Sequence, residues 1–526
     1  MHAGPDSCPV ALPATATSTV MPYVKGPSSV TPMVQAVNDY GFSADGVGVP
    51  VQVPVKATPG FRNVQFLEIS DFHGAIEPTS TSIGAATLAT AFASDREAVK
   101  STFVGSAGDN IGGSPLISSE FEEIPTIRAL NLMGLHVSAF GNHEFDGPLT
   151  HLRKLIDLST FEWVGSDFRP LDMLEGKAKD ASAVVVKNSG RVKVAFIGLD
   201  TADLAVRVTR TNLTDGGRIL TIDDTKVQAA IAEARANGAQ LVVGLLHRGW
   251  NAAENGRATG PLPDSIPLVK GVDLVFGGDS HLQYASIIAG KPVVQVPNSG
   301  QSYSRTVLCL NTTSNRVIGS SVDFVTKEML SSTPGNPRVE RMVAQYKQQL
   351  GARLDAKVGS VGGAFPRGGN PPVERSGETP MGDFAADALR AKYNTDFVIL
   401  NGGGTAVFSL GNNVATTTVT GESLWLALEN GVSKYPTDGR FPQISGFRFA
   451  FDPSQPVGSR ITSVTKADGT PIAKDGQAYS VTSVEFMVNG GDGYGTLGRD
   501  LIADESADDG LGENLGCGPI QVCIVV

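Results

Sequence analysis

The sequence predicts an α/β protein with largely buried strands, followed by a separate C-terminal domain. From Arg62 onward, short apolar and β-branched runs alternate with helical stretches. In residues 223–238 apolar side chains recur at helical spacing, and Asp223 or Asp224 is available as a cap. Residues 331–355 begin with a Pro/Gly break and continue as one amphipathic helix. We interpret that helix as a connection between domains.

Length and charge narrow the classes of function. The chain has 526 residues, enough for two or three domains. It carries 53 acidic and 42 basic residues and a formal charge of -11, which disfavours binding to polymeric nucleic acid or to anionic membranes. A small anionic substrate would need local compensation, which bound cations supply. No apolar run approaches the roughly 20 residues of a membrane span.

The first 60 residues and the cysteines say less about function. Residues 1–60 are rich in Pro, Ser, Thr, Val and Gly, which predicts an irregular or strand-like extension. The start lacks the basic region and the continuous apolar core of a secretory signal, and processing before residue 1 stays open. Cys517 and Cys523 are placed to close a terminal loop, which would favour an exported protein, or they are two unpaired thiols.

Five polar motifs come at the ends of predicted strands. They are SDFHG at 70–74, GSAGDN at 105–110, GNHEFDG at 141–147, LLHRG at 245–249 and GGDSH at 277–281. Because the carboxyl ends of strands in an open α/β sheet meet at one crevice, we expect the polar side chains of these motifs to gather. The predicted cluster consists of Asp71, His73, Asp109, Asn142, His143, His247, Asp279 and His281.

These residue types suit a pair of divalent ions. Carboxylate and amide oxygens and imidazole nitrogens bind zinc, manganese, iron or cobalt, and one carboxylate can bridge two ions. Such a pair activates water and offsets the charge of a reacting phosphate ester. A lone histidine after a strand is more often structural, but four of the seven histidines lie in these motifs. The sequence therefore predicts a dinuclear metal site of unspecified metal.

In order and spacing, the five motifs resemble those of the calcineurin-like metallophosphoesterases, and among them the 5'-nucleotidase and UDP-sugar hydrolase family. The resemblance runs from about residue 62 to 526. It implies a four-layer α/β/β/α metallophosphoesterase sandwich at 61–330, after the extension at 1–60. A linker helix at 331–355 would then lead to an α+β substrate-binding domain at 356–526.

The resemblance also implies a role for each residue. It assigns one metal to Asp71, His73 and His281, a bridging position to Asp109, and the second metal to Asn142, His247 and Asp279. It makes His143 the group that stabilises the phosphoryl group or protonates the leaving oxygen, oriented by Asp146. The family usually has histidine where this chain has Asp279. The added negative charge would weaken the Lewis acidity of the second metal and favour harder ions such as manganese.

The C-terminal half resembles the 5'-nucleotidase C-terminal domain in four segments. They are residues 375–389, 400–405, 420–432 and 486–498. The resemblance implies substrate-binding roles for Arg375, Asn401, Gly403, Leu410, Phe486 and Asp492. Two positions depart from the family: Thr405 follows NGGG where the family usually reads Ile-Arg, so one anion-binding arginine is missing, and Leu410 replaces one ring of an aromatic clamp for the base. Taken alone, the GGDGYG sequence predicts a tight turn, and 420–432 predicts a packing helix capped by Thr420.

From this we expect a hydrolase of nucleotide phosphate esters, including cyclic nucleotides or nucleotide sugars, in which metal-bound hydroxide attacks phosphorus. The expected partner is a small nucleotide, and oligomeric state stays open. An extracellular, periplasmic or cell-wall location follows from the resemblance. One alternative is a nucleotide-binding or surface protein that has kept the fold and lost turnover. Another is a phosphodiesterase without nucleoside preference.

Overall fold

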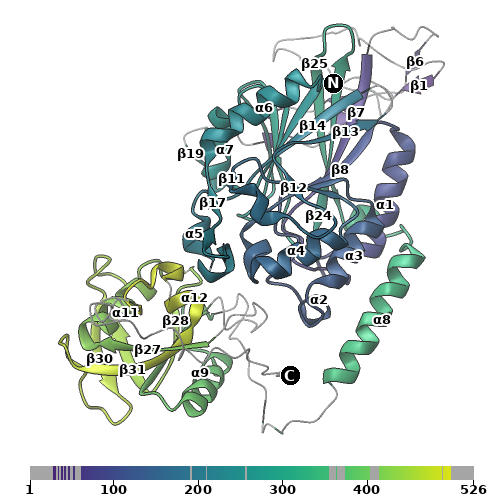
Figure 1. The fold of residues 1–526 in the computed structure, drawn as a ribbon. Coiled ribbons are helices and arrows are strands. Elements are labelled where there is room, and N and C mark those ends of the chain that lie inside the picture. The colour runs from purple at the N-terminus through teal and green to yellow at the C-terminus, as the bar shows by residue number, and fades with distance from the viewer. Residues whose placement is uncertain are drawn as a thin grey trace. The chain divides into compact units, whose positions relative to one another are not determined.

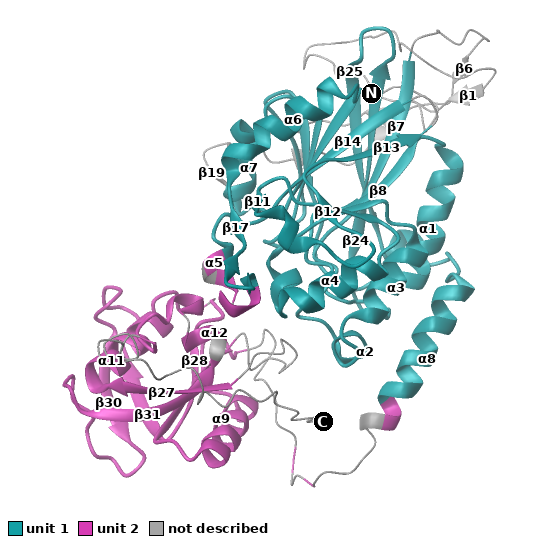
Figure 2. Ribbon diagram, viewed as in Figure 1, with its two compact units in different colours: residues 1–204, 213–350 teal, residues 205–212, 351–526 magenta. Residues whose placement is uncertain are grey.

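The computed structural model describes residues 61–498 and six short strands before them. The gaps within this range are 190–191, 209, 255–256, 355–359, 361–362, 364–372, 403–413, 437 and 489. The six strands are β1 (Ser28–Val30), β2 (Met33–Val34), β3 (Val37–Asn38), β4 (Gly41–Phe42), β5 (Gly46–Val47) and β6 (Val51–Val53). The chain forms two compact units, 1–204 with 213–350 and 205–212 with 351–526 (Figure 2).

The first sheet of unit 1 has the strand order β12-β10-β9-β8-β7-β24-β25. Its strands are β7 (Phe61–Ile69), β8 (Thr102–Ser106), β9 (Val137–Ala139), β10 (Glu162–Val164), β12 (Ala181–Ser182), β24 (Ser302–Asn311) and β25 (Arg316–Thr326). Strands β7 to β12 run parallel, so β7, β8 and β9 end on the same edge. Strands β24 and β25 add an antiparallel side.

The second sheet has the order β13-β14-β18-β21-β23-β22. Its strands are β13 (Val185–Ser189), β14 (Val192–Leu199), β18 (Leu241–Leu246), β21 (Leu274–Gly277), β22 (Tyr284–Ile288) and β23 (Lys291–Gln295). The inner four, from β14 to β23, are parallel. The predicted strand-end motifs at 245–249 and 277–281 therefore leave two adjacent strands at one edge.

The two sheets pack face to face with helices outside them, which confirms the four-layer α/β/β/α sandwich (Figure 1). Residues such as Phe66, Phe103 and Phe196 fill the space between the sheets. Helices α1 (Ala85–Ala98), α3 (Ile124–Met133) and α4 (Leu149–Leu158) lie on one side, and α6 (Val227–Ala236) and α7 (Pro261–Ser265) lie on the other. The apolar face of α6 packs on the second sheet.

Shorter elements complete unit 1. They are α2 (Leu116–Ser119), η1 (Asn142–Phe145), η2 (Leu171–Leu174), η4 (Asp224–Lys226), η5 (Ile266–Val269), η6 (Glu328–Leu330) and the strand pairs β11 (Phe168–Arg169) with β17 (Thr221–Ile222), β15 (Thr214–Asp215) with β16 (Arg218–Ile219), and β19 (Ala252–Glu254) with β20 (Arg257–Thr259). Asp223 caps η4 by accepting the Thr225 N–H at 3.1 Å, and η4 leads directly into α6. The predicted cap therefore acts one turn before the helix.

Helix α8 (Pro337–Leu354) lies within the segment predicted as a linker helix but begins later than residue 331. Asn336 explains the start, because its side-chain oxygen accepts the N–H of Arg338 at 2.9 Å. Proline at the first helical position costs no hydrogen bond, since that N–H has no partner within the helix. Val339 and Tyr346 form part of the buried face.

Unit 2 has its own core and an α+β fold. Its sheet has the order β27 (Val414–Thr420), β31 (Ala478–Val484), β26 (Phe397–Asn401) and β28 (Pro442–Ser445), and β29 (Phe447–Phe451) pairs with β30 (Ile461–Lys466). The helical elements are α5 (Leu204–Arg207), η3 (Arg210–Leu213), α9 (Pro380–Tyr393), α11 (Gly421–Gly431), α12 (Glu485–Val488) and η8 (Gly491–Gly493). Buried residues of α9 and α11 pack on the sheet.

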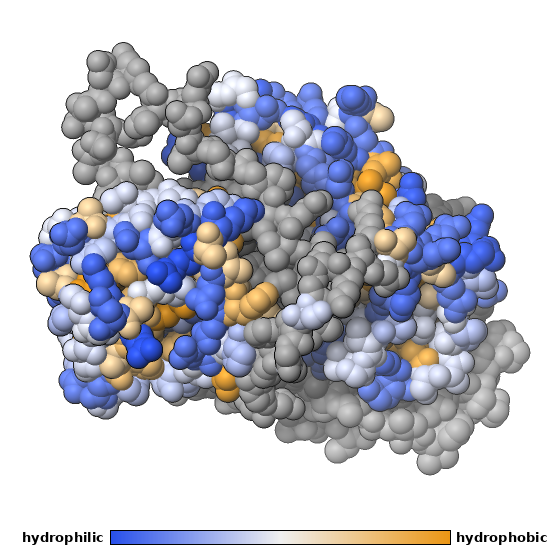
Figure 3. Space-filling view, turned by 90° about the horizontal axis from the view of Figure 1, so that it is seen from below, coloured by the Kyte–Doolittle hydropathy of each residue, from blue (hydrophilic) through white to orange (hydrophobic). Residues whose placement is uncertain are grey.

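None of the helices described is both long and apolar enough to cross a bilayer. One face of the molecule is largely hydrophilic, with scattered apolar residues (Figure 3). Cys309, buried in β24, is disulfide-bonded. Cys8, Cys517 and Cys523 lie outside the described residues, and so does the predicted Cys517–Cys523 bridge.

Thr420 caps α11 as predicted, because its hydroxyl accepts the Ser423 N–H at 3.1 Å. We expect Thr420→Ala to lower the free energy of unfolding of unit 2 by about 1 kcal/mol. Hydrogen exchange of peptides from 414–432 across a urea series measures the change. Thr418→Ala, on an exposed position of β27, is the control, and a loss of equal size there would argue against the cap.

Candidate metal centre and substrate-binding residues

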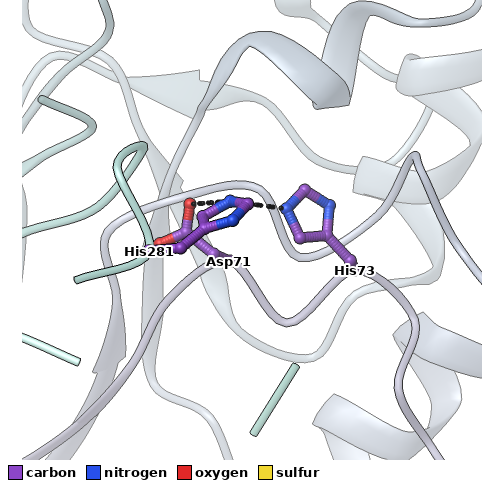
Figure 4. A group of neighbouring side chains, drawn as sticks. All are labelled: Asp71, His73 and His281. Atoms are coloured by element: carbon purple, nitrogen blue, oxygen red, sulfur yellow. Dashed lines mark hydrogen bonds and ion pairs between the residues drawn. The ribbon is translucent and has the colours of Figure 1, made fainter. Parts of the chain in front are cut away.

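The structure brings most of the predicted metal ligands together at the strand ends. Within the described chain, two groups of side chains offer ligand atoms that all lie within 4.8 Å of one another. One group is Asp71, His73 and His281 (Figure 4), and the other is Asp71, Asp109 and His247. These residues follow β7, β8, β18 and β21 and therefore come from both sheets.

Asp71 belongs to both groups, and Asp109 of the second group also approaches a histidine of the first. The Oδ2 atom of Asp109 is 3.1 Å from Nε2 of His247 and 4.0 Å from Nε2 of His73. On the other side, Nε2 of His281 is 3.5 Å from Asp71 Oδ1 and 3.4 Å from Nε2 of His73 (Figure 4). The Asp109 carboxylate thus faces one imidazole of each group, as a bridging ligand would.

Backbone carbonyls orient two of the imidazoles. Nδ1 of His73 lies 2.8 Å from the Gly112 carbonyl oxygen, and Nδ1 of His247 lies 3.0 Å from that of Ala107. A carbonyl can only accept, so each Nδ1 carries the proton. The Nε2 atoms therefore face the cluster, which is the arrangement of metal-binding histidines.

Three buried atoms of the cluster have no hydrogen-bond partner within the part of the chain described. They are Asp71 Oδ2, Asn142 Oδ1 and His247 Nε2. A buried polar atom without a partner is costly, and nearly all such atoms in folded proteins are satisfied. Carboxylate, amide and imidazole donors are a suitable set for divalent ions such as manganese and zinc. The residues present therefore fit a metal centre.

Burial and neighbouring charges shift the pKa values in the cluster. Burial lowers the pKa of His73 to about 3 and leaves this imidazole neutral. Burial also disfavours the charged carboxylate of Asp109, but His247 and His143 outweigh it and lower the Asp109 pKa. Burial raises the pKa of Asp71. The cluster therefore combines buried carboxyl groups with a neutral imidazole at His73.

The backbone at the ligands is unusual. Asp71, His73, Asp109, Asp279 and His281 all have φ between 45° and 74°, and they are five of the twelve non-glycine residues in the described chain with positive φ. A left-handed conformation costs a non-glycine residue roughly 1–2 kcal/mol. Such strain persists only where surrounding contacts impose it, so these loops are held in a defined geometry.

Two glycines allow the ligands to approach the backbone. A Cβ atom on Gly141 would lie 2.3 Å from Asp109 Oδ1 and 2.7 Å from the His247 ring. A Cβ on Gly278 would lie 3.0 Å from Asp71 Oδ2. Any larger residue at these two positions would push the ligands apart.

Glu144 ties together the two loops that follow β8 and β9. Its carboxylate accepts the N–H groups of Gly141 at 2.6 Å, Asp109 at 2.9 Å and Asn110 at 2.8 Å. Burial and the charge of Asp109 raise the pKa of Glu144 to about 8, while the N–H donors favour the ionised form. Sequence reasoning missed this role, although Glu144 directly follows His143 in its motif.

His143 and Asp146 form the predicted pair. Nδ1 of His143 lies 2.8 Å from Asp146 Oδ2, and the His143 backbone N–H donates to Asp109 Oδ1 at 2.8 Å. Burial lowers the pKa of His143, but the carboxylates of Asp146 and Asp109 prevail and raise it to about 10. The ring is partly exposed, at 28 % of its side-chain surface. The protonated, cationic His143 ring can therefore contact a ligand.

Asp279 lies outside both close groups. Its backbone N–H donates to Asp71 Oδ1 at 2.8 Å, and its side chain is partly exposed. The charge of Asp279 still contributes to raising the pKa of His247. The loop after β21 is therefore anchored at the cluster through the backbone of Asp279.

In unit 2 the structure brings together part of the predicted substrate site. Asn401 Nδ2 donates to Asp492 Oδ2 at 2.7 Å. Phe486 lies so close to Gly491 that a Cβ there would come within 2.4 Å of the ring. Arg375 is exposed, and its charge acts on Asp492. Gly403 and Leu410 lie outside the described residues, as does Thr405.

Arg440 is a neighbour of this site that sequence reasoning missed. Its guanidinium donates to Asn430 Oδ1 at 3.2 Å, and Asn430 Nδ2 donates to the Asp492 carbonyl at 2.9 Å. Arg440 also pairs with Asp438 at 2.9 Å. No motif marks Arg440, because its relation to Asp492 depends on packing between distant segments.

The fold and the strand-end cluster define a four-layer α/β unit with a candidate metal centre, accompanied by a separate α+β unit. Comparison with known proteins agrees. The family model of the 5'-nucleotidase C-terminal domain matches residues 357–499. The motif-based resemblance to the 5'-nucleotidase and UDP-sugar hydrolase family is thereby confirmed.

Several relatives match along most of this chain. Cell wall protein Lmo0130 of Listeria monocytogenes is 26 % identical over 86 % of this chain and 66 % of its own length. Endonuclease YhcR of Bacillus subtilis is 25 % identical over 81 % of this chain and 37 % of its own. The 5'-nucleotidase of Bos taurus is 22 % identical over 85 % of this chain and 86 % of its own length. This chain thus spans less than two thirds of the length of the first two.

Solved structures show the same fold. The 5'-nucleotidase precursor of Thermus thermophilus has a TM-score of 0.65 at 23 % identity, covering 83 % of this chain and 92 % of that one. A putative 5'-nucleotidase of Staphylococcus aureus has a TM-score of 0.68 at 19 % identity, with the same coverages. The likeness supports the two-unit architecture.

We expect Glu144→Gln to lower the free energy of unfolding by about 1–3 kcal/mol, because the side-chain amide would turn a donor toward a buried backbone N–H. Urea unfolding in the presence of a chelator measures this loss. Metal content after manganese loading should fall as well, since Asp109 and Asn142 lie on the loops that Glu144 joins. Glu97→Gln, on the exposed side of α1, is the control. Equal stability of the two variants would contradict the role of Glu144.

Proposed function

We propose that this protein hydrolyses phosphate esters of nucleotides at a centre of two divalent ions. The observation that carries the proposal is a set of three buried ligand atoms, Asp71 Oδ2, Asn142 Oδ1 and His247 Nε2, that form no hydrogen bond within the described chain. The similarity to the bovine 5'-nucleotidase, which extends over most of both chains, supports a nucleotide as the substrate. The negative formal charge of -11 makes local cations necessary for binding such a substrate.

One ion would be held by Asp71, His73 and His281, the other by Asn142, His247 and Asp279, with Asp109 between them. The ions, when bound, activate water and offset the charge on the phosphoryl group. Zinc, manganese, iron and cobalt all accept these donors, and the carboxylate of Asp279 favours manganese. The 3.1 Å and 4.0 Å contacts of Asp109 with two imidazoles support its bridging position.

His143 would act on the phosphoryl group as a cation. With Asp146 on Nδ1, its Nε2–H is available to a phosphoryl oxygen or to the leaving oxygen. The raised pKa, about 10, keeps the proton on the ring at neutral pH. Asp146 fixes the ring orientation and stabilises its charge.

The nucleoside would bind to the C-terminal domain, for which we propose the limits 356–526, after the sandwich at 61–330 and the helix at 331–355. Phe486 offers a ring for stacking on a base, and Asn401, Asp492 and Arg375 offer polar contacts. The 2.7 Å bond between Asn401 and Asp492 supports a shared site. We also assign Gly403 and Leu410 to it, from the motif that contains them.

A second candidate is a nucleotide-binding protein without turnover. Asp279 favours it, because an extra carboxylate weakens the Lewis acidity of the ion that it holds. A phosphodiesterase without nucleoside preference is the third. The three differ in whether phosphate is released from AMP and whether a simple chromogenic diester is cleaved.

We further propose an extracytoplasmic location. The disulfide at Cys309 supports it, since disulfides persist mainly in oxidising compartments. The similarity to a cell wall protein of Listeria supports it as well.

We expect His143→Ala to lower kcat for AMP by roughly 10²-fold to 10⁴-fold, because proton donation to the leaving group is lost. Phosphate release in manganese, zinc or cobalt measures activity, and elemental analysis should find metal content nearly unchanged. Wild-type protein that binds metal and nucleotide but releases no phosphate would favour the binding protein. Unchanged turnover of the variant would remove His143 from the reaction.

We expect Phe486→Leu to raise the KM for AMP by roughly 5-fold, the equivalent of about 1 kcal/mol of lost stacking. The KM for a chromogenic monoester without a base should stay unchanged. Phe449→Leu, which alters another half-buried ring of unit 2, is the control. Equal effects of Phe486→Leu on both substrates would exclude a base-stacking role.

A further inference from the structure

A closed set of hydrogen bonds joins the two loops of the second sheet that carry predicted ligands. Gln295, the last residue of β23, accepts the N–H of Trp250 through Oε1 at 2.9 Å and donates from Nε2 to the Ser280 hydroxyl at 2.8 Å. That hydroxyl in turn donates to the Trp250 carbonyl oxygen at 2.5 Å. Trp250 belongs to the loop of His247, and Ser280 lies between Asp279 and His281.

Packing keeps this set in place. Gln295 is fully buried, at 0 % exposure. The Trp250 indole stacks on Tyr284, with ring centroids 4.8 Å apart, and Tyr284 is paired with Gln295 across the sheet. The loops also touch directly, since a Cβ on Gly249 would lie 2.5 Å from that of Ser280. The amide of Gln295 can therefore turn neither away from its partners nor toward water.

We propose that Gln295 is a positioning residue for the metal centre, fixing the loop of His247 against the loop of Asp279 and His281. The inference rests on the proposed function, because it concerns how the same centre is assembled. Neither ligand loop is continuous with β23, so Gln295 acts on both from a third strand. Its hydrogen bond to the Ser280 hydroxyl engages the residue between Asp279 and His281, which both have left-handed backbone, with φ of 74° and 60°.

The test is a calorimetric titration of Mn²⁺ into chelator-treated protein. Gln295→Met keeps the length of the side chain and removes its hydrogen bonds. Outer residues that orient metal ligands typically contribute roughly 10-fold to 100-fold in affinity, and we expect a loss of that size for manganese. Gln65→Met is the matched control: Gln65 is buried in β7, and Nε2 donates at 3.1 Å to the Asp95 carbonyl oxygen and to the Thr102 hydroxyl. It should lower the Tm of the metal-free protein and leave manganese affinity unchanged.

Ser280→Ala provides a second route that does not disturb the core. We expect Ser280→Ala to weaken manganese binding too. The double variant should bind manganese no more weakly than Gln295→Met alone, because both substitutions break the same set of hydrogen bonds. Wild-type manganese affinity in Gln295→Met, or additive losses in the double variant, would overturn the role of Gln295 while the metal centre stands. A wild-type protein that binds no manganese would overturn both the metal centre and the role of Gln295.

Discussion

Unit 1 buries two carboxyl groups, those of Asp71 and Asp109, at the ends of its strands. A buried ionised group is unfavourable unless neighbouring groups compensate its charge. Part of the compensation is built into the chain. The backbone N–H groups of Asp279 and His143 donate to these carboxyl groups, and the imidazole of His247 lies against Asp109. The remaining donor atoms are those that would hold a cation. The glycines, the left-handed loops and the hydrogen bonds of Glu144 and Gln295 described above hold the residues around these groups in position.

Much of the architecture was predictable, because strand ends in an α/β sheet converge whatever the loops between them contain. The segments ending in Asp71 and His247 were recognisable from buried β-branched runs, and the structure places them at adjoining edges of a four-layer sandwich. Local details were less accessible. The start of α8 at Pro337 depends on a cap by Asn336, and Asp223 caps the turn η4 rather than α6 itself.

Residues that act from outside a motif were not predictable. Gln295 ends an ordinary strand, and its partners Trp250 and Ser280 come from two other loops. Arg440 similarly reaches Asn430 across the second unit. A single sequence records periodicity and spacing, but it does not record which buried amide meets which loop. The left-handed backbone at the ligands was equally hidden, because Asp and His give no signal of it comparable to glycine.

That backbone has a consequence for the protein's evolution and engineering. Glycine would relieve the unfavourable φ at Asp71, His73, Asp109, Asp279 and His281. Each such exchange would also delete a donor atom. Selection for robustness and selection for ligand capture therefore pull in opposite directions at the same five positions. Stabilising substitutions in this protein are best sought at positions remote from the strand ends.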